Sequence, residues 1–133
     1  MMDYNENVLR IFKDPKRSGK ITKADAVGEV GNARCGDIMR LYLKVDENEK
    51  ILDAKFQTFG CVAAIASTET ACDMIIGKTL DEALKLTNKE VLDRLGGLPD
   101  IKIHCSVLAE EVIQAAVLDF RKKQAKKQEK ENK

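Results

Sequence analysis

Alternating apolar and polar residues in the first half of the chain predict a β-hairpin. Residues 37–45 alternate with the period of a half-buried strand. After the polar segment 46–50, a second alternation places Leu52, Ala54 and Phe56 on one face. We therefore expect two antiparallel strands joined by a turn at 46–50, with these three residues facing the core.

Apolar residues recur at helical spacing elsewhere in the chain. A short amphipathic segment at residues 7–12 should end before Pro15, because proline cannot continue a helix interior. A longer segment at residues 62–76 has apolar residues three to four positions apart and should end at Gly77. The chain thus changes from strand periodicity to helix periodicity close to residue 61.

Two capping boxes predict two further short helices. Thr79 is followed three residues later by Glu82, and Thr87 by Glu90, which is the spacing that satisfies free N–H groups at a helix start. The last helix should begin near Ser106 and lose its order in the lysine-rich end of the chain. We expect that end to be frayed and solvated.

Together these elements predict an α+β fold, in which helices pack on one face of a small antiparallel β-sheet. No linker or repeat divides the chain, so we assign residues 1–122 to one domain and 123–133 to a lysine-rich C-terminal tail. The segment between Gly28 and Gly31 is too rich in glycine for a long element, and we expect it to be mobile.

Composition and charge narrow the class of protein. The 133 residues carry a formal charge of +1 and include two Tyr, four Phe and no Trp. The sequence therefore lacks the basic segments with interleaved aromatic residues that are typical of nucleic-acid binding. The acidic N-terminus lacks the apolar run of a signal peptide, and no segment has the roughly 18 apolar residues of a membrane span. We expect a cytoplasmic protein with no membrane partner.

The four cysteines are the main chemical signal. In the reducing cytoplasm, cysteines are metal ligands or reactive thiols more often than they are disulfides. Candidate ligands fall in three separate segments, namely Cys35 with Asp37, Cys61, and His104 with Cys105. Thiolate and imidazole select zinc, iron or an iron–sulfur cluster over magnesium and calcium.

Each of these residues also has a plainer interpretation. A single free cysteine is often a small buried hydrophobic residue, and we keep that interpretation for Cys72 in the middle of a predicted helix. Cys61 and Cys105 instead precede predicted helices, whose N-termini favour a thiolate. The spacing differs from that of zinc fingers, and five candidate ligands favour an open site over a closed structural one.

Four segments carry a family resemblance. They are Gly28-Glu29-Val30-Gly31 with Cys35-Gly36-Asp37, Phe59-Gly60-Cys61 with Ala64-Ile65-Ala66-Ser67, the run from Leu98 to Ser106, and Asp14-Pro15-Lys16-Arg17-Ser18-Gly19. In these segments the sequence resembles the IscU-type iron–sulfur cluster assembly scaffolds, the family equivalent to the N-terminal domain of NifU. The resemblance covers nearly the whole chain except its lysine-rich end.

The resemblance implies a carrier and not an enzyme. Sulfur would arrive as persulfide from a cysteine desulfurase, combine with iron into a [2Fe–2S] cluster, and pass with it to apo iron–sulfur acceptor proteins. Cys35, Cys61 and Cys105 match the family's cysteines, Asp37 and His104 match its non-thiolate ligand positions, and Cys105 matches its persulfide acceptor. The resemblance is also compatible with zinc binding to the cluster-free protein and with a homodimer.

Two departures and two alternatives accompany this interpretation. Asp100 replaces the second proline of a family motif that an Hsp70-type chaperone reads in some members, which leaves that partner open. Val62 replaces a glycine of the family after Cys61.

One alternative function is a zinc-dependent, sulfur-accepting transferase of related fold, although such relatives lack a histidine like His104. The other is a binding module that zinc only stabilises.

Overall fold

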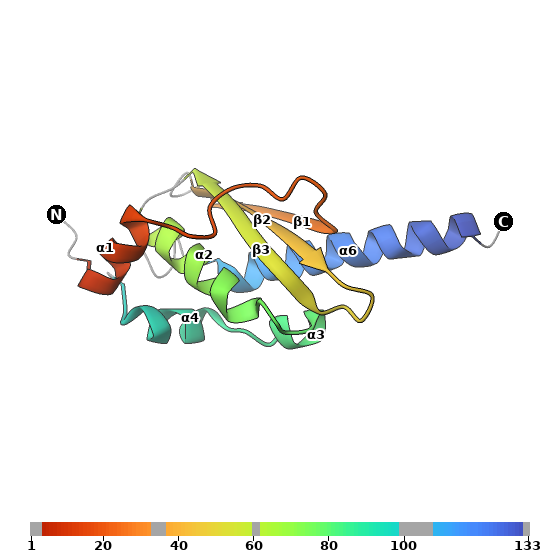
Figure 1. Cartoon of the computed structure of the whole chain (residues 1–133). Helices are drawn as coiled ribbons and strands as arrows, with labels where there is room; N and C mark the ends of the chain where they lie inside the picture. Colours follow the sequence, from red (N-terminus) through yellow and green to blue (C-terminus); the bar gives the residue numbers. More distant parts are fainter. Residues whose placement is uncertain (1–3, 33–36, 60–61, 99–107, 132–133) are drawn as a thin grey trace.

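The structure is a computed structural model that describes residues 4–32, 37–59, 62–98 and 108–131. Its centre is a three-stranded antiparallel sheet of order β1-β2-β3. The strands are β1 (Ala26–Asn32), β2 (Asp37–Val45) and β3 (Ile51–Phe59), and the helices are α1 (Glu6–Lys13), α2 (Val62–Ile75), α3 (Leu80–Ala83), α4 (Asn88–Leu95) and α6 (Ala109–Glu131). Helices α2 and α6 pack against the sheet, and α1 and α4 pack against α2 (Figure 1).

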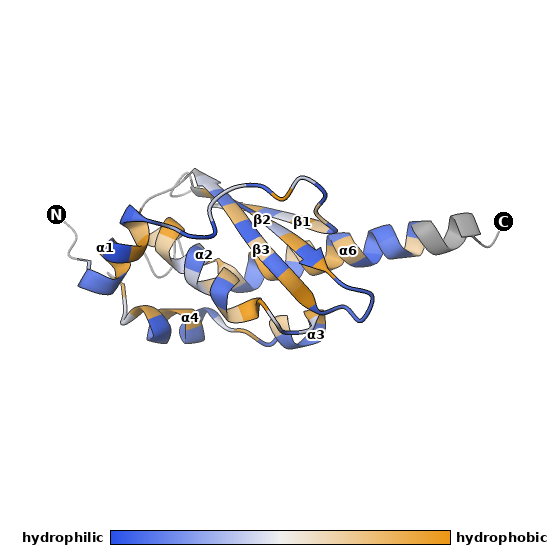
Figure 2. Cartoon of the chain, viewed as in Figure 1, coloured by the Kyte–Doolittle hydropathy of each residue, from blue (hydrophilic) through white to orange (hydrophobic). Residues whose placement is uncertain are grey.

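The core lies between the sheet and these helices, as the α+β prediction requires. Met39, Leu41 and Leu43 of β2 are almost fully buried, and the strands alternate between hydrophobic and hydrophilic residues in Figure 2. On the same face, Thr68 of α2 contacts the sulfur of Met39, and Gly28 of β1 contacts α6. The predicted hairpin and the layer of helices on one face of the sheet are therefore confirmed.

The prediction that Leu52 faces the core was wrong. The register shifts between Lys44 and Val45, so that Val45 pairs with Ile51 whereas Lys44 pairs with Asp53. This β-bulge leaves Leu52 as an extra residue and reverses the alternation across it. Ile51 is consequently buried, and Leu52 is 53% exposed. The hydrophobic pattern alone does not reveal the bulge.

The expectation of a mobile segment at Gly28 and Gly31 was also wrong, because both lie in β1. A Cβ atom at Gly28 would lie 2.7 Å from the Val112 carbonyl oxygen and 2.8 Å from Ala116 Cα, and it would also meet the backbone nitrogen of Ala116. The glycine thus marks a close approach between a strand and a helix backbone. Packing against α6 stabilises this strand, and the β-propensity of its own residues does not predict that packing.

The predicted helix signals are confirmed within the described residues. Thr79 and Glu82 form a complete capping box at α3, and the Thr87 hydroxyl accepts from the Glu90 N–H at the start of α4. Gly77, which follows α2, and Gly96, the C-cap of α4, have positive φ values of 89° and 86°. Both positions use the conformation that glycine adopts without a steric cost.

Helix α6 extends past the sheet as a single long helix (Figure 1). The predicted loss of order near its lysine-rich end was wrong, because the helix continues to Glu131. Lysine, glutamine, alanine and glutamate all favour helix, and Lys123 pairs with Asp119 one turn earlier at 2.9 Å. Side chains 121–126 are exposed as expected, and in the part of the chain that the structure describes no helix is long and apolar enough to cross a bilayer.

Candidate functional site

Most of the predicted ligands lie outside the described residues. Cys35, Cys61, His104 and Cys105 belong to the intervals 33–36, 60–61 and 99–107, and the side chain of Asp37 is also outside the description. The backbone of Asp37 forms the first residue of β2. The described residues that flank each interval show where its chain begins and ends.

Two of the three intervals begin and end at the same end of the sheet. Asn32, the last residue of β1, pairs with Asp37 across the connection that contains Cys35. The next residue of β2, Ile38, pairs with Phe59, the last residue of β3. Because α2 starts at Val62, the connection that contains Cys61 spans only two residues from that same end of β3.

The third interval ends at the N-terminus of α6, and the contacts of β1 give the direction of that helix. The Val27 N–H donates to Asp119 Oδ2 at 2.9 Å, whereas the following residue, Gly28, packs against Val112 and Ala116. Helix α6 therefore runs antiparallel to β1, and its N-terminus points toward the end at which β1 stops. The chain enters α6 from the side of the Asn32–Asp37 and Ile38–Phe59 pairs.

Helix α4 fixes the start of α6. The Glu110 N–H donates to the Asn88 side-chain oxygen at 3.0 Å, and the Glu110 carboxylate accepts from the Asn88 N–H at 3.0 Å. This reciprocal pair joins the first turns of the two helices and satisfies one free donor of each. The described residues that flank the third interval are thus anchored to the helical layer.

Cys72 is placed as the sequence predicted, in the middle of α2 and 1% exposed. Burial raises the pKa of its thiol, and the nearby Glu69 and Asp73 carboxylates add to the increase. A neutral, buried thiol is a poor nucleophile and a poor metal ligand. Among the described residues, no group of three or more His, Cys, Asp and Glu side chains could hold a metal ion.

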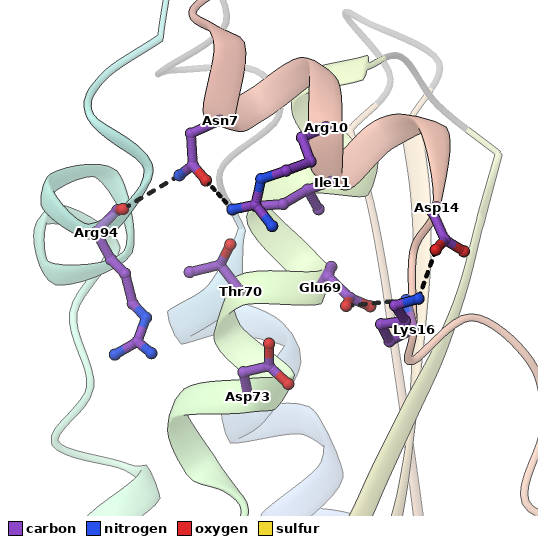
Figure 3. Close-up of a pocket in the computed structure, with 9 residues that line it drawn as sticks. All are labelled: Asn7, Arg10, Ile11, Asp14, Lys16, Glu69, Thr70, Asp73 and Arg94. Atoms are coloured by element: carbon purple, nitrogen blue, oxygen red, sulfur yellow. Dashed lines mark hydrogen bonds and ion pairs between the residues drawn. The ribbon is translucent and has the colours of Figure 1, made fainter.

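A cavity of about 470 Å³ lies between α1, α2 and α4, and the sequence did not predict it (Figure 3). Its lining residues are Asn7, Arg10, Ile11, Asp14, Lys16, Glu69, Thr70, Asp73 and Arg94. Glu69 is 4% exposed and accepts the N–H groups of Lys16 at 3.0 Å and Arg17 at 2.6 Å. We call the space that these nine residues line the α1/α2/α4 cavity.

A sequence signal for this cavity existed. Glu69 and Asp73 are the only acidic residues in α2, which otherwise consists of apolar and small polar residues. They stand four residues apart and therefore on one helix face. A buried carboxylate such as Glu69 requires donors, and the backbone of the segment after Pro15 supplies them. The Arg17 side chain of that segment also donates to the exposed Asp73 at 2.9 Å.

Comparison with known proteins identifies relatives over most of the chain. Residues 3–127 match the family model of the NifU-like N terminal domain. The iron-sulfur cluster assembly scaffold protein IscU 1 of Archaeoglobus fulgidus is 50% identical over 123 residues, which cover 92% of this chain and 80% of that protein.

The nitrogen fixation protein NifU of Nostoc sp. is 50% identical over 128 residues, which cover 91% of this chain but only 43% of NifU. The chain therefore spans less than half of the NifU proteins that it matches. A NifU-like N-terminal structure from Brucella abortus has a TM-score of 0.70 and 23% identity, and the match covers 90% of this chain and 94% of that one. That structural likeness supports the fold. From the family model and the 50% identity to a scaffold protein of similar length, this chain belongs to the IscU/NifU N-terminal domain family.

Proposed function

We propose that the protein is a scaffold on which an iron–sulfur cluster is assembled from iron and sulfur and then transferred to acceptor proteins. The observation that carries the proposal is that described residues next to three connections lie toward one end of the sheet. The Asn32–Asp37 pair, the Ile38–Phe59 pair and the N-terminus of α6 flank the intervals that contain Cys35, Cys61 and Cys105.

Chain length limits how far each cysteine can lie from these flanking residues. Consecutive Cα atoms are about 3.8 Å apart. Cys61 directly precedes Val62, Cys35 stands two residues before Asp37, and Cys105 stands three residues before Leu108. Each cysteine therefore stands within three residues of a described flanking residue, which supports a shared site in which the three thiolates hold one cluster.

The donor set fits iron and sulfur as cargo. We propose Cys35, Cys61 and Cys105 as thiolate ligands, with Asp37 or His104 in the fourth position. Three thiolates bind iron strongly, whereas an oxygen or imidazole ligand is exchanged more readily than a fourth thiolate. A scaffold requires that balance, because a [2Fe–2S] cluster must be held during assembly and released afterwards. The same ligands also suit zinc in the cluster-free protein.

We further propose that Cys105 accepts sulfur from a cysteine desulfurase. Its thiolate would attack the outer sulfur of the desulfurase persulfide, so that a new S–S bond forms on Cys105 and the donor cysteine leaves as a thiolate. Cys105 stands four residues before Ala109, the first residue of α6, and a helix N-terminus favours an anion nearby. The protein is in this view a carrier and not an enzyme.

The proposed partners are a cysteine desulfurase and apo iron–sulfur proteins. Asp100 stands in place of the family proline, and this substitution alters the segment that a dedicated Hsp70-type chaperone would bind. We assign the protein to the cytoplasm because its proposed function needs reduced cysteines, which that compartment maintains. The zinc-dependent sulfurtransferase has less support, because residue 104 is a histidine and the 50%-identical relative of similar length is named a scaffold.

Anaerobic reconstitution tests this function. The protein is incubated with ferrous iron, cysteine and a cysteine desulfurase, and then with apo-ferredoxin. Visible absorption of a [2Fe–2S] centre, followed by its appearance on ferredoxin, is expected. Tight stoichiometric zinc without cluster absorption would favour the transferase or a structural zinc site instead. Mass spectrometry without iron should find persulfide on Cys105, and undiminished persulfide in Cys105→Ser would contradict that assignment.

A further inference from the structure

The α1/α2/α4 cavity contains both arginines that lack a carboxylate partner in the described part of the chain. Five arginines are described, and three of them pair with carboxylates. These pairs are Arg17 with Asp73 and Asp53, Arg40 with Glu29, and Arg121 with Asp81. The remaining two, Arg10 and Arg94, line the same cavity from α1 and α4.

The cavity's carboxylates are already bound to other groups. Glu69 accepts one backbone N–H on each of its two oxygens, Asp73 accepts from Arg17, and Asp14 pairs with Lys16. The formal charges of the lining residues cancel, but the acidic groups and Lys16 have partners, whereas the two guanidinium groups have no carboxylate within ion-pair distance among the described side chains. Arg10 and Arg94 are therefore the two cationic side chains of a charge-balanced cavity that no described carboxylate pairs with.

Asn7 orients one of these guanidinium groups. Its amide oxygen accepts from Arg10, and its amide nitrogen donates to the Leu95 carbonyl oxygen at 3.3 Å, with a longer contact to the Arg94 carbonyl at 3.5 Å. Figure 3 shows Arg10 above Thr70, with the side chain of Arg94 extending along the α4 side. A planar guanidinium held by a neutral partner is preorganised to bind an anion.

We propose that the α1/α2/α4 cavity binds carboxylate groups through Arg10 and Arg94. The volume of about 470 Å³ lies within the range of roughly 300–1,000 Å³ that is typical of small-molecule sites. Ile11 adds an apolar surface for a carbon chain, which inorganic phosphate would not use. The carboxylate comes either from a small dicarboxylic acid or from acidic side chains of a partner protein, and none of the described lining residues is a proposed cluster ligand.

The test is an NMR titration of the whole ¹⁵N-labelled chain in low-chloride buffer. Three probes are used: succinate, a blocked peptide with two adjacent glutamates, and inorganic phosphate. Succinate or the peptide should shift backbone resonances of α1 and the end of α4. Arg10→Gln and Arg94→Gln should each weaken binding by about tenfold, the effect expected from losing a hydrogen-bonded charge pair. Shifts with succinate identify a small acid as sufficient, and shifts with the peptide alone identify a partner protein as the source.

Matched variants separate a defined site from general attraction to positive charge. Arg40→Gln and Arg121→Gln remove the same charge outside the cavity and should leave binding unchanged. Arg10→Lys keeps the charge but loses the planar fork, so it should fall between wild type and Arg10→Gln. The proposal is overturned if neither carboxylate probe shifts α1 or α4, if phosphate binds more tightly than succinate, or if Arg40→Gln weakens binding as much as Arg10→Gln.

Discussion

The two ends of the sheet differ in how the chain connects the strands. At one end the β2–β3 turn is closed by local hydrogen bonds, since the Asp46 carboxylate accepts the N–H groups of Asn48 at 2.8 Å and Lys50 at 2.9 Å. Among the described residues, Glu49 is the one residue other than glycine with a positive φ, which is 62°. This end contains turn chemistry and no cysteine or histidine.

At the opposite end, the connections from β1 to β2 and from β3 to α2 contain Cys35 and Cys61. The strand pairs Asn32–Asp37 and Ile38–Phe59 bring the ends of these two connections together, although the two cysteines are 26 positions apart in the sequence. One end of the sheet therefore stabilises the hairpin, and the other carries the residues suited to sulfur and iron. Variants at the two ends and in the core between them should separate these two roles.

The largest expected effect on stability comes from Gly28→Val. The added side chain would clash with the backbone of α6 at Val112 and Ala116, which cannot move without separating the helix from the sheet. We expect a loss of about 3 kcal/mol or more in the free energy of unfolding, at the upper end of overpacking effects. Chemical denaturation measures it. Glu29→Ala, an exposed change in the same strand, is the control and should cost less than about 1 kcal/mol.

Cys72→Ser should lower stability while leaving cluster assembly intact. The substitution places a hydroxyl in a buried position of α2, which costs about 1–3 kcal/mol in protein interiors. Denaturation gives the stability, and visible absorption after reconstitution gives the cluster content of the folded protein. A variant that is as stable as wild type but holds no cluster would contradict the structural role of Cys72.

Asp46→Ala should cost about 1 kcal/mol, because it removes the acceptor for two backbone N–H groups in an exposed turn. Cluster assembly should be unchanged, since the turn lies at the opposite end of the sheet from the proposed ligands. Reconstitution and denaturation are measured on the same preparation. A large loss of cluster with little loss of stability would show that the two ends are not independent.

The smallest effect is a pH dependence at Asp119. Partial burial raises the pKa of this carboxyl, but the hydrogen bond from the Val27 N–H and the nearby Lys123 outweigh it, so the pKa is lowered. A lowered pKa in the folded state adds stability above the unfolded pKa, and that stability is lost as the pH falls through the folded value. The difference in thermal stability between wild type and Asp119→Asn should therefore shrink in acid. A constant difference from neutral pH into acid would contradict this coupling.

The strands and helices with regular patterns could be predicted from the sequence, whereas long-range packing could not. The alternation of Met39, Leu41 and Leu43 and the cap at Thr79 are local signals, and both were confirmed. The position of Leu52 depends on a register shift, and the strand around Gly28 depends on contact with α6. Neither effect is encoded within a short window of residues.

Part of the candidate site could likewise be predicted from the sequence, and part required the fold. Residue types and the family resemblance indicated Cys35, Cys61 and Cys105, and the fold adds the shared direction of the elements that flank them. The α1/α2/α4 cavity escaped prediction because it joins Arg10, Glu69 and Arg94 from three helices. Glu69 is conspicuous in the sequence as an acidic residue of an otherwise apolar helix, but Arg10 and Arg94 have ordinary surface contexts, and only the packing of α1 and α4 on α2 brings the three together.

The most direct test of the central claim compares cluster content across four single cysteine variants. Cys35→Ser, Cys61→Ser, Cys105→Ser and Cys72→Ser are reconstituted anaerobically under the same conditions, and iron and sulfide per folded chain are measured together with visible absorption. The expected result is that the first three lose most of the stable [2Fe–2S] cluster and that Cys72→Ser retains it. Loss of the cluster in Cys72→Ser, with retention in Cys61→Ser, would contradict a site at the end of the sheet where β3 passes into α2.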